Sequence, residues 1–121
     1  MDKIAFNTLT KKIFLDYGFF KEKTKYVLML KDVTIVVRLA SWRGIKYFSY
    51  VFSINKIHDM TLPYESRSDC IVEIKMKHTA GNSNDYHNHE ISFEQYTEEE
   101  YRILLTNMLH AYFDPYKVNA L

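Results

Sequence analysis

Residues 26–54 read YVLMLKDVTIVVRLASWRGIKYFSYVFSI, and this stretch decides the fold. Apolar side chains alternate with other residues in three successive runs, which are separated at 31–32 and at 43–44. Alternation with a period of two is typical of β-strands. Two-residue turns at these points place Leu28 beside Ile35 and give both hairpins the same apolar face. Because a slip of one residue would turn that face over, the stretch predicts a three-stranded antiparallel meander.

The three lysines that alternate over 21–25, just before Tyr26, are typical of a solvated edge strand. Two further strands are predicted after this meander. After a loop at 56–69, residues 72–76 alternate as a half-exposed strand, and 91–93 read as a fifth, shorter strand.

Helices are predicted at both ends of the chain. Residues 2–17 carry apolar side chains at helical spacing, an aspartate suited to the N-cap begins them, and Gly18 suits the C-terminal cap. Thr97 and Glu100 have the spacing of a capping box in front of a second apolar stripe. The Asp-Pro pair at 114–115 is expected to end that helix.

The predicted order is helix, five strands, helix (α-β-β-β-β-β-α). An antiparallel meander has one core face, and two amphipathic helices must bury their stripes against something. The sequence therefore predicts a single α+β domain over residues 1–121, with the N-terminal and C-terminal helices packed on one face of the sheet.

The opposite face of the first three strands is unusually apolar for a surface. A homodimer contact or a partner-protein site is one explanation, since Trp, Tyr, Met and Arg are enriched at interfaces. A cover formed by the loop at 56–69 or by the C-terminal tail is another, and a ligand cleft is a third. The candidate interface residues are Val27, Met29, Val36, Trp42, Tyr47 and Val51.

Three histidines form the strongest candidate for a metal centre. Pairing Ile74 with Ile91 on apolar grounds brings His78 opposite His87, with His89 nearby. Imidazoles at alternate strand positions point to one side, as zinc or nickel ligation requires. A fourth ligand is not evident, and a polar hairpin end explains the same residues without a metal.

Composition narrows the function classes. The chain has 121 residues, a net charge of +1 and a single cysteine, Cys70, which cannot form an internal disulfide. Neither a transmembrane run nor the apolar core of a signal peptide is evident. We therefore expect a cytoplasmic protein that binds neither nucleic acid nor membrane and needs no cofactor. No nucleophile stands in a catalytic constellation, and the glycines do not form a phosphate-binding loop.

The even net charge conceals an asymmetry. Residues 1–60 are predominantly basic, whereas residues 61–121 are predominantly acidic, and 78–101 contain acids but neither Lys nor Arg. Two oppositely charged halves packed in one domain would account for this pattern. An acidic edge that steers a basic partner is the alternative.

Residues 5–56 resemble a family of small bacterial domains of unknown function. In that family an N-terminal helix leads into a Gly-Phe-x-Lys strand start, followed by an apolar strand and an aromatic strand that ends in Asn. The Gln-Lys-Ser that is typical before the aromatic stretch is replaced here by Leu-Ala-Ser at 39–41. The resemblance implies an α+β domain with no assigned activity. The residues that carry it are Gly18, Phe19, Lys21, Trp42, Tyr47, Phe48 and Asn55.

Three functional hypotheses follow from these patterns. The first is a protein-interaction module, of inhibitor, immunity or adaptor type, that acts by steric binding. The second is a small-ligand binder whose aromatic pocket between sheet and helices is walled by Tyr26, Tyr50, Tyr101 and Tyr112. The third is a metal-dependent enzyme at the three histidines.

Overall fold

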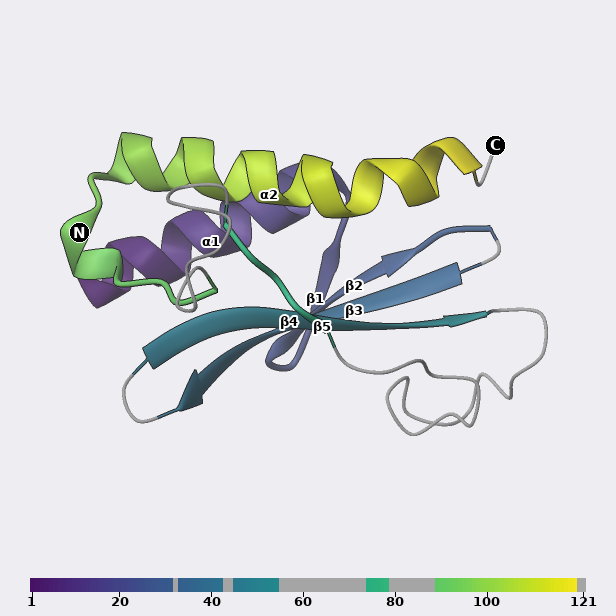
Figure 1. Ribbon diagram of the computed structural model, residues 1–121, viewed down its shortest axis with the longest axis horizontal. Helices are drawn as coiled ribbons and strands as arrows, with labels where there is room; N and C mark the ends of the chain where they lie inside the picture. The colour runs from purple at the N-terminus through teal and green to yellow at the C-terminus, as the bar shows by residue number, and fades with distance from the viewer. Residues whose placement is uncertain (32, 43–44, 55–73, 79–88, 120–121) are drawn as a thin grey trace.

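The computed structural model describes residues 1–31, 33–42, 45–54, 74–78 and 89–119 (Figure 1). Its elements, in chain order, are α1 (Lys3–Tyr17), β1 (Phe20–Glu22), β2 (Lys25–Met29), β3 (Val33–Trp42), β4 (Ile45–Ile54), β5 (Ile74–Lys75), the 3-10 helix η2 (Phe93–Gln95) and α2 (Glu98–Asn119).

The five strands form one antiparallel sheet in the order β1-β2-β3-β4-β5. Both helices lie over the same face of this sheet, one beside the other (Figure 1). The prediction of an α+β fold, with a five-stranded antiparallel sheet between an N-terminal and a C-terminal helix, is confirmed.

The register of the central strands is the one that the alternating pattern predicts. In the first hairpin Leu28 lies opposite Ile35, and the backbone N–H of Leu30 donates to the carbonyl oxygen of Val33 at 2.9 Å. Both hairpins therefore present one apolar face to the helices. The inward-facing cross-strand pairs are Tyr26–Val37, Leu28–Ile35, Val37–Tyr50 and Leu39–Phe48.

Helix α1 has the two caps predicted for it. The Asp2 carboxylate accepts a hydrogen bond from the Ala5 backbone N–H at 2.8 Å. Gly18 adopts a φ of 124°, which strongly favours glycine, and its N–H donates to the Leu15 carbonyl oxygen at 3.1 Å. Since α1 lacks a basic residue in its last turn, Lys117 of α2 supplies one, and its Nζ donates to the Tyr17 carbonyl oxygen at 2.7 Å.

Strands at the two edges of the sheet differ from the prediction. The basic stretch before Tyr26 forms a hairpin, with β1 paired to β2, and Lys23 in its turn has a φ of 57°. The predicted strand over 91–93 and its pairing of Ile74 with Ile91 are wrong. Ile74 pairs with Tyr50, while Ile91 makes an isolated bridge to Lys46 farther along β4.

The segment that follows Ile91 turns inward because its aromatic residue packs in the core. Phe93 begins the 3-10 helix η2, and its ring stacks on Phe6 of α1 with the ring centroids 4.7 Å apart. An aromatic side chain that is drawn under the helices in this way cannot continue a strand along the edge of β4.

Helix α2 continues beyond the Asp-Pro pair that was expected to end it. It runs to Asn119, with Pro115 inside the helix. A proline in a helix interior costs about 3 kcal/mol. Contacts of the following turn offset this cost, since Tyr116 packs against the core and Lys117 reaches the end of α1.

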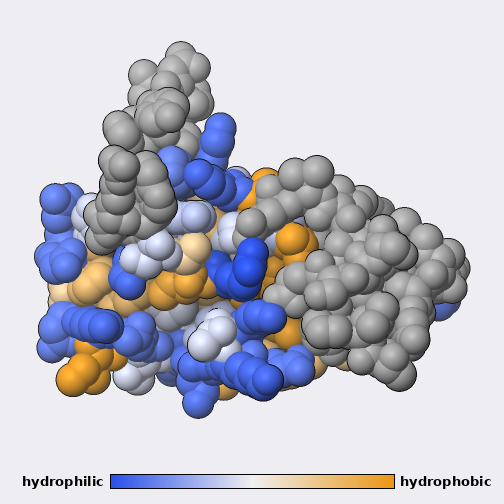
Figure 2. Space-filling view, turned by 90° about the horizontal axis from the view of Figure 1, so that it is seen from below, coloured by the Kyte–Doolittle hydropathy of each residue, from blue (hydrophilic) through white to orange (hydrophobic). Residues whose placement is uncertain are grey.

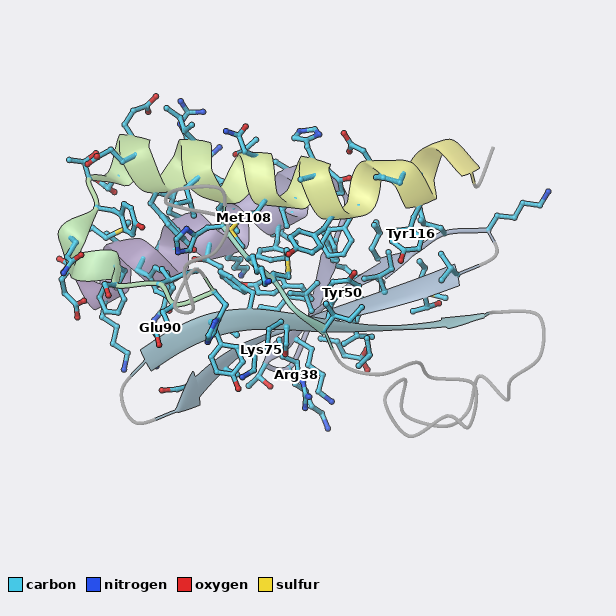
Figure 3. The ribbon with its side chains drawn as sticks, viewed as in Figure 1. Arg38, Tyr50, Lys75, Glu90, Met108 and Tyr116 are labelled. Carbon is cyan, nitrogen blue, oxygen red and sulfur yellow. The ribbon has the colours of Figure 1, made fainter. Side chains whose placement is uncertain are left out.

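The core lies between the sheet and the two helices, which run parallel to each other. Phe6 and Tyr101, near the two helix starts, have ring centroids 5.1 Å apart, and near the two ends the Tyr17 hydroxyl donates to Asp114 at 2.6 Å. In Figure 3 the side chains of Tyr50, Met108 and Tyr116 fill the layer between the sheet and α2.

Candidate functional site

The candidate surface is the outer face of the sheet, the face turned away from the helices. Figure 2 shows the molecule from this side, and hydrophilic side chains there lie beside hydrophobic ones. Alternate residues of β2, β3 and β4 point to this face because successive strand side chains alternate. The sequence predicts these positions correctly, since Val27–Val36, Val36–Val51 and Ala40–Tyr47 are cross-strand pairs.

Three of the predicted interface residues are buried. Val27, Val36 and Val51 form a cluster of their own, with exposed fractions of 0%, 1% and 8%. Thr34 and Ser49, which face the same side, are buried too. The centre of this face therefore packs within the chain and is not an open apolar patch.

Exposed apolar side chains lie at the margin of the valine cluster. Met29 is 47% exposed, as an interface residue would be, and Phe20 of β1 is 42% exposed opposite Val27. Tyr47 is half-buried. Trp42 pairs with Ile45 at the end of β3, but its side chain lies outside the described part of the chain.

A row of cations crosses the same face beside the valines. Lys25 of β2 lies opposite Arg38 of β3, Arg38 opposite Ser49 of β4, and Ser49 opposite Lys75 of β5. Arg38 and Lys75 both point away from the helices in Figure 3. We call Lys25, Arg38 and Lys75 the basic row, and Glu22 of β1 lies opposite Lys25 at one end of it.

Aromatic side chains continue the basic row along β4. The Lys75 Nζ lies 5.1 Å from the centroid of the Tyr47 ring, within the range of a cation–π contact. The imidazole of His89 also packs on Tyr47, edge to face, with the ring centroids 5.7 Å apart. Cations and aromatic rings thus form one continuous surface over β4 and β5.

The three histidines of the predicted metal centre have separate surroundings where they are described. The Nε2 of His78 lies 3.0 Å from the Glu90 carbonyl oxygen, so this nitrogen carries the proton and donates it. Its Nδ1 is buried without a hydrogen-bond partner. His89 packs on Tyr47, and His87 lies outside the described residues. Within the described ranges, no group of three His, Cys, Asp or Glu side chains has the geometry to hold a metal ion.

The four tyrosines of the predicted ligand pocket belong to the packed core. Tyr26, Tyr50 and Tyr101 are each at most 6% exposed, and Tyr50 meets Tyr112 edge to face at 5.7 Å. Burial, with smaller contributions from the neighbouring Tyr116 and Tyr112, raises the pKa of Tyr50 to about 12. The Tyr112 hydroxyl accepts a hydrogen bond from the Lys77 backbone N–H at 2.7 Å. These rings fill the layer instead of lining a pocket.

Part of the acidic segment forms the start of α2, in the helix layer. Glu98, Glu99 and Glu100 form the first turn of α2, where they complement the helix dipole. The capping box is confirmed, since Glu100 accepts from the Thr97 N–H at 3.0 Å and the Thr97 hydroxyl accepts from the Glu100 N–H at 3.1 Å. Hydrogen bonds from Arg102 lower the pKa of Glu99, and those from Thr97 lower the pKa of Glu100.

Comparison with protein-family models, curated proteins and solved structures found no match to the chain. The resemblance to a bacterial domain family therefore stays a prediction. Neither described helix combines the length and the apolarity that a membrane span requires. Cys70 and the loop at 56–69 lie outside the described residues.

Proposed function

We propose that the chain is a protein-binding module that docks an acidic partner on the outer face of its sheet. The observation that carries the proposal is the basic row formed by Lys25, Arg38 and Lys75 across neighbouring strands. Such a module acts by steric binding, as an inhibitor, an immunity-type protein or an adaptor does.

The composition of this face supports protein recognition. Arginine and tyrosine are the types most enriched among residues that dominate binding energy, and Arg38 and Tyr47 lie on this face. Met29 and Phe20 add exposed apolar area at the margin. Aligned positive charges raise the association rate with an acidic surface and lower it with a basic one.

The basic row argues for a different partner rather than a second copy. A two-fold interface presents the same patch from both subunits, so a symmetric contact centred on the basic row would oppose cation to cation. Of the described acids, Glu22 lies opposite Lys25 at one end of the row, whereas Glu98, Glu99 and Glu100 lie in the first turn of α2, in the helix layer. A homodimer through the outer face is therefore disfavoured, and it is an outcome of the test below.

The test is titration of the full chain with fluorescently labelled poly-glutamate, read by anisotropy at low and at high salt. The charge-reversal variant Arg38→Glu/Lys75→Glu should weaken binding roughly tenfold or more, because the attraction of an acidic chain depends on these cations. Salt should weaken wild-type binding as well. Lys3→Glu/Lys11→Glu is the matched control, since both lysines are exposed on α1, and it should bind nearly as well as wild type.

Thermal unfolding of every variant distinguishes lost binding from lost folding. Lys75→Glu alone is a second variant at an exposed position, and it should lower affinity while the fold is retained. Equal weakening in the α1 control would contradict the proposal, as would tighter binding to single-stranded oligothymidine. Light scattering that reports a dimer in wild type and a monomer in Arg38→Glu/Lys75→Glu would assign the face to self-association instead.

A further inference from the structure

A groove runs between the two parallel helices, apart from the sheet face considered above. It encloses about 410 Å³, in the size range of small-molecule sites. Helix α1 contributes five side chains to it and α2 contributes five. The lining residues are Leu9, Lys12, Ile13, Asp16 and Tyr17 of α1, and Arg102, Thr106, Leu109, His110 and Lys117 of α2.

The groove has an apolar base. Ile13 and Leu109 are buried in the helix–helix contact, and Leu9 packs beside them against the core. Apolar area of this kind favours a ligand with a hydrocarbon or aromatic body. Thr106 also lines this space, and it is the only lining residue with an aliphatic hydroxyl group.

Two cationic or titratable side chains at one end of the groove, Lys117 and His110, are paired within the protein. The Lys117 Nζ donates to the Tyr17 carbonyl oxygen at 2.7 Å and lies 3.6 Å from the centroid of the Tyr17 ring. The His110 Nδ1 lies 2.9 Å from an Asp114 carboxylate oxygen, which also holds the ring orientation. Lys117 is therefore engaged with the end of α1, and His110 pairs with Asp114 on its own helix.

The other two cations of the groove, Lys12 and Arg102, form exposed ion pairs whose carboxylate a ligand can replace. Lys12 pairs with Asp16 at 3.3 Å, and both side chains are 69% exposed. Arg102 pairs with Glu99, and its side chain is 51% exposed. Exposed ion pairs of this kind contribute at most about 1 kcal/mol, so a ligand anion can replace either carboxylate at small cost.

We propose that the groove between α1 and α2 binds an amphipathic organic anion, with its apolar body on Leu9, Ile13 and Leu109 and its anionic head at Lys12 and Arg102. Lys12, Arg102 and Lys117 line the groove with one acid, Asp16, while Glu99 and Asp114 beside it pair with Arg102 and His110. An anion that displaces Asp16 or Glu99 gains the attraction of Lys12 or Arg102, which a neutral or cationic molecule of the same shape does not gain. The inference is independent of the proposed protein partner, because it concerns the helix layer.

The experiment is a fluorescence titration of the full chain with anilinonaphthalene sulfonate, which combines an aromatic body with one anionic group. Phenylnaphthylamine, which has a similar body without the charge, is the matched probe. We expect saturable binding of the sulfonate with one site per chain, and binding of the neutral probe at least about fivefold weaker. Octanoate should displace the sulfonate, because it is an anion with an apolar chain.

Variants locate the site. Thr106→Phe fills the groove and should abolish the signal, whereas Asn107→Phe, at an exposed position one residue farther along α2, should retain it. Arg102→Glu should weaken the sulfonate roughly fivefold and leave the neutral probe unchanged. Thermal unfolding checks that each variant folds, and Lys12→Glu gives a second test of charge on the other helix.

Three results would overturn the inference. The first is no saturable binding of the sulfonate by wild type. The second is a signal that survives Thr106→Phe in a folded protein, which would place the dye elsewhere. The third is equal affinity for the charged and the neutral probe, which would show that the cations select nothing.

Discussion

Two hydrogen bonds at the buried Thr10 hydroxyl show how α1 is joined to α2. Thr10 of α1 is 2% exposed, and its hydroxyl donates to the Phe6 carbonyl oxygen at 2.7 Å. A hydroxyl has one proton to donate. The Tyr101 hydroxyl, 2.6 Å from the same Thr10 oxygen, must therefore be the donor in that contact. Burial raises the pKa of Tyr101 well above its ordinary value, so this donor stays protonated throughout the neutral range.

The direction of this hydrogen bond predicts an unequal pair of variants. Thr10→Val leaves a buried donor on Tyr101 without an acceptor and should cost about 2 kcal/mol, whereas Tyr101→Phe removes the donor and should cost about 1 kcal/mol. The double variant should cost less than the sum, because two apolar groups replace a matched pair. Urea unfolding of the four proteins measures these values. The assignment of donor and acceptor would be contradicted if the two single variants lost equal free energy of unfolding and the double variant lost the sum of both.

The parallel helix pair depends on polar contacts at its far end. Asp114 of α2 accepts from the Tyr17 hydroxyl of α1 at 2.6 Å and lies within hydrogen-bond distance of His110. Chiefly the Tyr17 hydrogen bond, and then His110, hold the pKa of Asp114 below its ordinary value of 3.8. The same carboxylate, together with burial as the larger cause, raises the pKa of Tyr17.

This lowered pKa predicts how the helix pair responds to acid. A carboxyl group whose pKa is lower in the folded than in the unfolded state contributes stability above its unfolded pKa, and that contribution disappears as the pH falls through the folded pKa. Asp114→Asn should therefore destabilise the protein at neutral pH, and the difference from wild type should shrink between about pH 5 and pH 2. Urea unfolding across this range measures it.

Asp16→Asn provides the control for this acid series. Its carboxylate makes one exposed ion pair with Lys12 on the same helix, so the substitution should change stability little at any pH. A difference between wild type and Asp114→Asn that stays constant down to the lowest pH would show that the Tyr17 contact does not depend on ionisation of Asp114.

Elements with one strong local signal were predictable from the sequence. The alternation of β2, β3 and β4 determined their register, and Asp2 and the Thr97–Glu100 box determined both helix starts. The end of α2 was not predictable, because Pro115 is a local stop signal that is outweighed by the distant contacts of Tyr116 and Lys117. The predicted pairing of Ile91 with Ile74 is wrong because matching apolar residues between strands does not show that Phe93 packs against Phe6 of α1.

The candidate sites were predictable only in part. The cross-strand pairs of the valine cluster are predicted correctly, but the burial of this cluster depends on what packs around it, and alternation alone does not report that. The basic row could have been found by reading Lys25, Arg38 and Lys75 across the predicted strands instead of along each one. The groove between the helices depends on their parallel docking, which no local pattern specifies.

For the whole molecule, the burial of Val36 tests whether the centre of the outer sheet face packs within the protein or binds a partner. Because Val36 is 1% exposed, Val36→Lys places a charge where it cannot be solvated and should destabilise the fold by about 3 kcal/mol or more. Met29→Lys, on the same face at a 47% exposed position, should change stability by no more than about 0.5 kcal/mol. Thermal and urea unfolding of both variants checks this. A fully stable Val36→Lys protein would instead mark that position as an open docking surface.

The parallel arrangement of α1 and α2 also sets the order in which this fold can assemble. Their hydrogen bonds join residues 91, 97 and 100 positions apart in the chain. Contacts of such high sequence separation slow folding, since a long loop must close before they are gained. On the ribosome, the part of α1 that carries Thr10 and Tyr17 has no α2 partner until α2 has been made, about 100 residues later. The interval between these two events is when this chain is most exposed to aggregation and to chaperones.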